Sequence, residues 1–99
     1  MAQDAVTADP NRYAVELEND DVRVLRIKYG PGEKSVMHGH PRSLGVALTD
    51  VHVRFTSPDG STEEARFNAG DAAWFPETEH LPENLGDQPL EMIFVEFKG

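Results

Sequence analysis

Met37-His38-Gly39-His40 and, much further along the chain, Glu79-His80-Leu81-Pro82 carry three of the four histidines of this sequence. Side chains on a β-strand alternate between its two faces, so His38 and His40 point the same way if they lie on a strand. A third histidine from a distant strand completes a set of three ligands and leaves coordination positions open. This arrangement is typical of a catalytic metal site, whereas structural sites are closed.

The rest of the chain consists of short segments with strand character, separated by turn residues. The clearest turn signals are Gly30-Pro31-Gly32, Ser57-Pro58-Asp59-Gly60 and Asn68-Ala69-Gly70-Asp71. We expect strands near residues 13–18, 22–29, 36–40, 44–49, 51–56, 62–67, 72–75, 81–84 and 91–97. No window has a helical apolar period of useful length. Many short strands with no helix to cover a sheet predict an all-β sandwich or barrel.

One expected strand differs from the others in its pattern. Residues 44–49 are apolar almost throughout, whereas Val51, Val53 and Phe55 alternate with polar residues. An uninterrupted apolar run is expected for a strand that is buried on both faces.

The length of 99 residues allows one domain, and the hydrophobic content of 38% supports a modest core. Residues 1–12 are polar and acidic, so we expect a flexible N-terminal segment there and a single domain over residues 13–99. Those first residues lack the basic start and apolar run of a signal peptide, and no apolar stretch is long enough to cross a bilayer. A cytoplasmic location is the expectation.

Charge and cysteine content exclude several classes of function. Nine basic residues stand against 18 acidic ones, which gives a formal net charge of −9. Nucleic acid and anionic membranes are therefore not expected as partners, because both need clustered basic residues. The chain has no cysteine, so it has no disulfide, thiolate ligand or cysteine nucleophile. A bound metal would need nitrogen and oxygen ligands.

Two linked motifs resemble those of the cupin superfamily over nearly the whole chain, from about Val22 to Phe97. Gly32, five residues and then His38-Gly39-His40 match the start of the first cupin motif. Gly70, five residues, Pro76, then His80, three residues and Asn84 match the second. Two motifs in the right order are far more specific than either one alone.

The chain departs from the cupin pattern at three places. The first motif normally carries a glutamate a few residues after His-x-His, but Ser43, Leu44 and Gly45 occupy the positions where it would fall. Asp50 replaces the closing glycine of that motif. The second motif is one residue shorter than usual, with Thr78 near the usual glycine. The last two departures affect loops, and the first affects chemistry.

The resemblance implies a jelly-roll barrel of six to eight strands, with the three histidines pointing into its mouth. It also implies that His38, His40 and His80 bind a divalent metal and that the chain forms a homodimer, as many cupins do. Cupins bind iron, manganese, nickel, zinc or copper in such sites. Three-histidine iron sites resemble those of thiol dioxygenases and β-diketone-cleaving dioxygenases, which makes iron(II) the first choice here, with zinc, nickel and copper open.

The missing carboxylate has an electrostatic consequence. Three histidine ligands are neutral, so a divalent ion would keep its full double charge, which favours a small, anionic, chelating substrate. Imidazole ligands suit iron, zinc, copper and nickel. Glu79 or Glu83 could supply a carboxylate from the second motif, but Glu79 would point away from His80 on a regular strand.

Other residues are candidates for the surroundings of the site. Met37, Trp74, Phe75 and Phe94 are candidates for a hydrophobic wall, and each could equally be ordinary core. Arg42 could bind a substrate carboxylate or simply be a solvated arginine. The remaining histidine, His52, lies between Val51 and Val53 and is expected on the face opposite the apolar one.

Three functions are compatible with these observations. The first is an iron(II)-dependent, dioxygenase-like oxidoreductase that acts on a small anionic substrate. The second is a non-oxidative isomerase or lyase that uses zinc or nickel. The third is a binding module for a metal or a small ligand without catalysis. Fold alone does not decide among them, because one fold hosts many functions.

Overall fold

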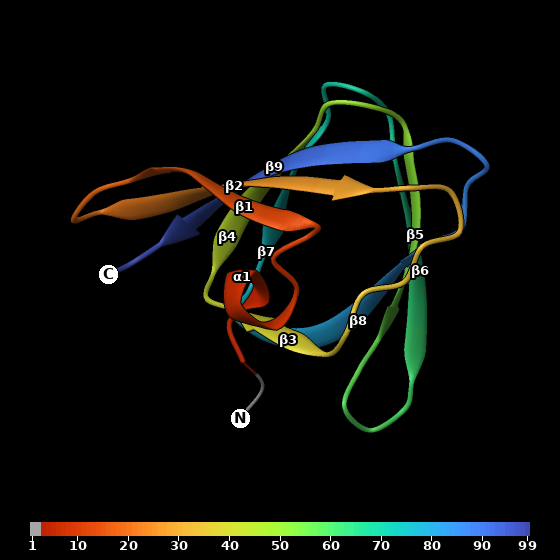
Figure 1. Cartoon of the computed structure of the whole chain (residues 1–99), viewed down its shortest axis with the longest axis horizontal. Coiled ribbons are helices and arrows are strands. Elements are labelled where there is room, and N and C mark those ends of the chain that lie inside the picture. Colours follow the sequence, from red (N-terminus) through yellow and green to blue (C-terminus); the bar gives the residue numbers. More distant parts are fainter. Residues whose placement is uncertain (1–2) are drawn as a thin grey trace.

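The computed structural model describes residues 3–99, which form two antiparallel β-sheets and one short helix (Figure 1). The elements are α1 Ala5–Ala8, β1 Tyr13–Glu18, β2 Val22–Tyr29, β3 His38–His40, β4 Ser43–Ala47, β5 Val51–Thr56, β6 Thr62–Phe67, β7 Ala72–Phe75, β8 Thr78–Asn84 and β9 Leu90–Phe97. One sheet has the order β1-β2-β9-β4-β7 and the other the order β3-β8-β5-β6. No helix within residues 3–99 could span a membrane.

The strand pattern of the sequence is confirmed, with small differences at the ends of strands. The nine strands match the nine expected segments and exceed the six to eight that the resemblance implied. The third strand is shorter than expected, because only His38–His40 pair in the sheet. The strand β8 begins at Thr78, ahead of the expected residue 81, so His80 lies within a strand. This earlier start places His80 directly opposite His38.

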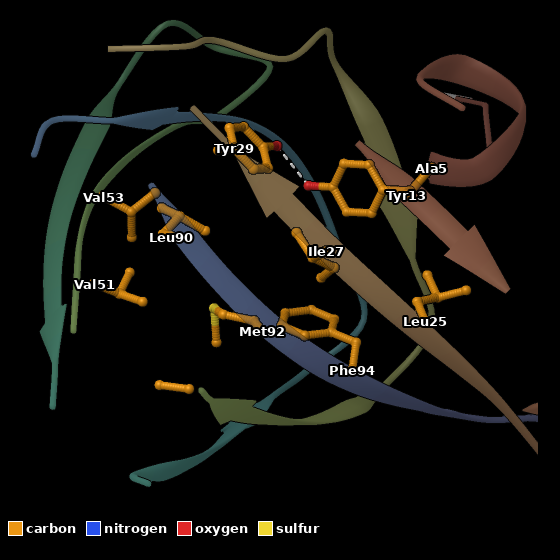
Figure 2. Packing of buried hydrophobic residues seen from close by; sticks show 11 residues of the cluster. Ala5, Tyr13, Leu25, Ile27, Tyr29, Val51, Val53, Leu90, Met92 and Phe94 are labelled. Atoms are coloured by element: carbon orange, nitrogen blue, oxygen red, sulfur yellow. Dashed lines mark hydrogen bonds between the residues drawn. The ribbon is translucent and has the colours of Figure 1, made fainter. Parts of the chain in front are cut away.

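The core lies between the two sheets, and alternation along the central strands builds it. Residues of β9 are alternately buried and partly exposed, and Leu90, Met92 and Phe94 point inward. Leu25 and Ile27 of β2 lie beside them on the same inner face, as Figure 2 shows. The remaining buried apolar residues are Ala5, Tyr13, Tyr29, Ala47, Val51 and Val53. This apolar layer lies beneath the three histidines.

The segment before β1 packs against the domain. Ala5 is fully buried, and α1 contacts β1 and β3 (Figure 1). The Asp4 side chain caps the helix by accepting a hydrogen bond from the Thr7 backbone nitrogen at 3.2 Å. The Gly39 backbone nitrogen, between the two motif histidines, donates to the Gln3 carbonyl at 2.8 Å. The polar composition of residues 1–12 did not predict these contacts, and residues 1 and 2 lie outside the described part of the chain.

Gly45 is the position in the core where a side chain has least room. It lies in β4 between β7 and β9. A Cβ atom added there would lie 2.8 Å from Phe75 Cε2 and 2.9 Å from Phe94 Cε1. The absence of a side chain at this position therefore allows both rings to pack over the strand.

We predict that Gly45→Ala lowers the free energy of unfolding by about 1–3 kcal/mol, the usual cost of overpacking a core. The new methyl group must displace two rings that are themselves packed. Urea denaturation followed by circular dichroism measures the change. An unaltered midpoint would show that the two rings move aside freely and would contradict this view of the core.

Candidate metal centre

The three motif histidines come together on the inner face of the four-stranded sheet. His38 and His40 lie two residues apart on β3, and His80 on β8 pairs with His38 in the antiparallel register. The three rings are mutually perpendicular or nearly so, with centroids 4.8 to 5.1 Å apart. One ring nitrogen from each residue lies within 4.8 Å of the others, and all three residues are buried. The predicted trio is thus assembled by strand alternation and cross-strand pairing.

Hydrogen bonds orient two of the three rings, and the Nε2 nitrogen of all three rings lacks a partner. His38 Nδ1 donates to the Val36 carbonyl at 2.8 Å, and His40 Nδ1 donates to Glu96 Oε2 at 2.7 Å. The Nε2 atoms of His38, His40 and His80 are buried and have no hydrogen-bond partner among the described residues. Each unsatisfied buried polar group costs about 1–3 kcal/mol. Three lone pairs converging without partners fit a metal ion.

The protonation of the histidines also fits a metal. Burial, with a smaller contribution from nearby His40, lowers the pKa of His38 from 6.5 to about 4. Burial, followed by the neighbouring His40 and His38, lowers the pKa of His80 to about 2. Both rings are therefore neutral at pH 7, which is the form that binds a metal.

A buried ion pair between Glu96 and Arg23 supports His40 on the side of its Nδ1 atom. Glu96 is only 2% exposed, and its Oε1 accepts a hydrogen bond from Arg23 Nε at 2.9 Å while its Oε2 accepts the one from His40. Arg23 in turn pairs with Asp4, the cap of α1. A carboxylate that accepts from the distal nitrogen of a ligating histidine fixes its tautomer and strengthens it as a donor. The N-terminal segment is thus linked to the centre through charged side chains.

The sequence analysis missed Glu96, although one signal was present. Alternation along β9 places Leu90, Met92, Phe94 and Glu96 on the inner face. A glutamate at an inward position of an alternating strand needs a buried partner. That requirement could have identified it as part of a site.

The absence of the usual cupin glutamate has a structural counterpart. Ser43 is fully buried and pairs with Glu96 across β4 and β9, whereas Leu44 points to the outer face. At Gly45 the Phe75 and Phe94 rings leave no room for a longer side chain. The carboxylate of this centre therefore comes from the neighbouring strand, and it contacts His40 at Nδ1, the side opposite the free nitrogen.

Phe75 and Phe94, two of the five residues that the sequence analysis named as surroundings of the site, line a small cavity beside the histidines. Phe94 lies 5.1 Å from the His40 ring, measured between centroids. Phe55, which the sequence analysis did not single out, stacks on His80 at 4.9 Å. The cavity has about 30 Å³ of free space, which is room for about two water molecules. Its lining is almost wholly apolar.

Met37, Arg42 and Trp74, the other three expected residues, do not line this cavity. Trp74 is 58% exposed and stacks on Phe97, on the outer side of the five-stranded sheet. Arg42 lies in the same outer recess and donates a hydrogen bond to the Gly99 carbonyl. Alternation explains the difference for Trp74, because its neighbour Phe75 takes the inward position on β7.

The other acidic and histidine candidates also lie away from the trio. Glu79 pairs with Gly39, and alternation places it on the face opposite His80. Glu83 lies 3.7 Å from Arg54. His52 Nε2 hydrogen bonds to Glu64 at 2.9 Å, on the outer face as expected. No carboxylate among the described residues joins the three-histidine group.

Two tyrosines that the sequence analysis missed supply the remaining polar atoms of the cavity. The Tyr13 and Tyr29 hydroxyl oxygens are 2.6 Å apart, joined by the dashed line in Figure 2. Tyr13 packs edge-on against His38 at 4.8 Å. Burial raises the pKa of Tyr29 to about 12 and that of Tyr13 well above its usual value. Both hydroxyls therefore stay protonated at neutral pH, and in their mutual hydrogen bond one donates and the other accepts.

The lowered histidine pKa values predict how the metal-free protein responds to acid. The unfolded chain takes up a proton on His38 near pH 6.5, whereas the folded chain resists until about pH 4. Unfolding therefore becomes more favourable as the pH falls through this window, by roughly 3 kcal/mol for His38 alone. Chemical denaturation in chelator at several pH values measures the slope.

The control for this prediction is His38→Gln, which removes the titrating group. The variant is expected to have a shallower slope between pH 6.5 and pH 4 than the parent chain. Equal slopes for the two proteins would contradict the burial of a neutral His38.

We predict that Glu96→Gln weakens metal binding about 10–100-fold, the usual effect of losing the partner of a ligating histidine. The variant keeps the size of the side chain but removes its charge beside His40 and Arg23. Competition titration with zinc(II) and a chelating dye measures the affinity. Glu91→Gln is the matched control, because Glu91 pairs with Arg26 on the outer side of the same strand. Equal affinities for the two variants would show that Glu96 does not act through His40.

Comparison with known proteins bears on the fold. No protein-family model and no curated protein sequence matches this chain. Among solved structures, a cupin domain from Bordetella pertussis matches with a TM-score of 0.81 at 24% identity, over 88% of this chain and 92% of that one. A Klebsiella pneumoniae protein with a double-stranded β-helix domain matches with a TM-score of 0.69 at 23% identity, over 90% and 79%.

A third match is part of a larger enzyme. Oxalate decarboxylase from Bacillus subtilis, described with Mn(II) centres, matches with a TM-score of 0.59 at 22% identity, over 77% of this chain. This chain covers only 21% of the length of that enzyme. The two-sheet topology, the two motifs and these matches together lead to one conclusion: the chain has the double-stranded β-helix fold of the cupin superfamily, with three histidines gathered inside it.

Proposed function

We propose that this protein is a mononuclear metalloenzyme in which His38, His40 and His80 hold one divalent ion. The observation that carries the proposal is the convergence of three buried Nε2 atoms without partners. Leaving three such lone pairs unsatisfied is costly, and a metal ion satisfies all of them at once. Three protein ligands also leave positions open for a substrate, as catalytic sites require.

Iron(II) is the metal that we propose, with zinc, nickel and copper as the alternatives that imidazole ligands suit. When bound, such an ion supplies Lewis acidity and, in the case of iron(II), electrons for the reduction of oxygen. The protein supplies orientation through the Val36 carbonyl and Glu96, and a largely apolar cavity that limits water.

The lining of the cavity supports oxidative chemistry over isomerase or lyase chemistry. Isomerases and lyases need a positioned acid or base that exchanges a proton with the substrate. Among residues 3–99, no carboxylate or ammonium group lines the cavity, and its tyrosine hydroxyls are held protonated by burial. The reaction is therefore proposed to depend on the ion and an added oxidant, molecular oxygen, with Tyr13 and Tyr29 as hydrogen-bond donors.

The substrate that we propose is a small anion that binds the ion directly. The free space of about 30 Å³ leaves no room for a large group beside the histidines. No arginine or lysine lines the cavity, so a substrate charge would be balanced by the double charge of the ion. On the outer side of His40, Asp4 and Glu77 line an open recess, and their carboxylates disfavour multiply charged anions.

A non-catalytic metal- or ligand-binding role is the second candidate. The same two features that limit the chemistry, a very small cavity and the lack of an acid–base group, favour it. It differs from the first proposal in one outcome only, which is turnover of a substrate by the metal-loaded protein.

We predict that protein purified without added metal contains about one divalent ion per chain, and that His80→Ala loses it. His52→Ala is the matched control, because this histidine lies on the outer face and pairs with Glu64. Elemental analysis measures the metal content of each protein. Retention of the ion by His80→Ala, or equal loss in both variants, would contradict the proposed ligands.

Oxygen consumption distinguishes the two candidate functions. The iron-loaded protein is expected to consume oxygen in the presence of a small thiol or 1,3-diketone, and His80→Ala is expected not to do so. Metal binding without oxygen uptake across such a panel would reject the dioxygenase proposal and leave the binding role.

A further inference from the structure

Binding of the proposed substrate releases a proton inside the cavity. A small thiol is mostly neutral at pH 7, and an apolar cavity admits the neutral acid more readily than its anion. The acid then loses its proton when it binds the ion as an anion. Among the described residues, no carboxylate lines the cavity to accept that proton. The proton therefore needs a path to water.

A series of hydrogen bonds leads away from the cavity, and it begins at the two tyrosines that line it. The Tyr13 and Tyr29 hydroxyl oxygens are 2.6 Å apart and face each other (Figure 2). Tyr29 also hydrogen bonds to Ser35, which lies between β2 and β3. The Ser35 hydroxyl donates to Asp9 Oδ2 at 2.6 Å. Three hydroxyl groups thus connect the cavity to one buried carboxylate.

The charge of Asp9 sets the direction of each donor in the series. A carboxylate only accepts hydrogen bonds, so Ser35 uses its single proton on Asp9. Ser35 can then only accept from Tyr29, and Tyr29 in turn accepts from Tyr13. The Tyr13 oxygen, at the cavity end, is left with lone pairs and has no donor among the described residues. The series is therefore aligned to take up a proton at Tyr13.

The other end of the series reaches the surface of the protein. Arg12 Nη1 lies 3.1 Å from Asp9 Oδ2, and Arg12 Nε lies 3.3 Å from Glu33. The exposed fraction of the side chain rises from 7% at Asp9 to 23% at Arg12 and 46% at Glu33. The arginine charge offsets the cost of burying the carboxylate, and the edge position of Asp9 lets it exchange a proton with water.

Packing alone gives no reason for these polar groups. Buried hydrogen-bonded partners can be replaced together by apolar groups of the same shape at little cost in stability. Apart from the tyrosine hydroxyls and two histidines, His40 and His80, the side chains that line the cavity are apolar. The buried hydroxyls instead follow one path, from the cavity to the carboxylate nearest the surface.

We propose that Asp9 is the proton acceptor of this site and that two tyrosines and a serine carry protons to it. The proposal rests on the proposed function, because ionisation of the substrate on the metal ion supplies the proton. The S–H bond of a thiol breaks, its electron pair stays on sulfur, and the proton passes to the Tyr13 oxygen. Each hydroxyl gives its own proton to the next oxygen, and Asp9 becomes a neutral acid.

The relay returns to its starting state when Asp9 gives its proton to water and the hydroxyls rotate back. Burial keeps the pKa of both tyrosines high, so each holds a proton before and after the transfer. No electron is transferred in these steps. The relay carries the proton away from the cavity, so it does not replace the acid or base that an isomerase keeps beside its substrate.

Protein loaded with nickel(II) tests the relay without turnover. Thiolate bound to nickel absorbs in the near ultraviolet, so stopped-flow mixing with 2-mercaptoethanol at pH 7 measures the rate at which the anion forms. An indicator dye in weak buffer measures the proton that reaches the water. We expect Asp9→Asn and Ser35→Ala to slow both signals about 100-fold, the lower end of the contribution of a general base. Nickel content and thiol affinity are expected to stay unchanged, because neither residue lines the cavity.

The matched control is Asp59→Asn, which is expected to behave as the parent. Asp59 also accepts a hydrogen bond from a serine hydroxyl, that of Ser61 at 2.6 Å, but in an exposed turn. Equal rates in the parent and in a folded Asp9→Asn or Ser35→Ala variant would overturn the relay alone. Slower rates with a matching loss of affinity and nickel would also overturn it, because they indicate a structural role. If Asp9→Asn fails to fold by circular dichroism, Ser35→Ala decides the outcome. A parent protein that binds no thiolate would overturn the proposed function and the relay with it.

Discussion

Three imidazole lone pairs that converge inside an apolar domain are the constraint on which this structure depends. Burying a polar group without a partner opposes folding, and here three occur within a few ångströms of each other. The protein does not relieve the cost with hydrogen bonds. Hydrogen bonds at Nδ1 orient the rings of His38 and His40, so that Nε2 of each ring stays without a partner. An arrangement that costs stability and leaves nitrogen lone pairs aligned is typical of a functional site.

The centre is held by elements that lie far apart in the sequence. His40 contacts Glu96 of the last strand, and Glu96 forms an ion pair with Arg23 of β2. Arg23 in turn forms an ion pair with Asp4, which precedes α1. Along this series of contacts, Arg23 lies between two carboxylates of opposite charge, those of Glu96 and Asp4. The positive charge beside Glu96 is what makes its burial tolerable. The first and last segments of the described chain thereby meet at His40. A disturbance of the N-terminal segment would be felt at His40 through these contacts.

Much of this could be predicted from the sequence, because alternation and turn residues are local signals. The nine strands and the shared facing of His38 and His40 follow from such signals. Contacts between distant segments could not be predicted in this way. Glu96 and Tyr13 reach the site only through the pairing of β9 and β1 with their neighbours. The sequence offered Trp74 and Phe75 alike as candidates beside the site, because their strand is too short to show which of the two faces inward.

The inner face of β9 is directed toward the three histidines through Phe94 and Glu96. The central claim remains the coordination by three histidines. X-ray absorption at the edge of the bound metal tests it most directly. We predict about three imidazole nitrogens, at about 2.0–2.1 Å if the ion is zinc, with oxygen ligands completing the shell. A shell of oxygen atoms alone, or of a single imidazole, would contradict it.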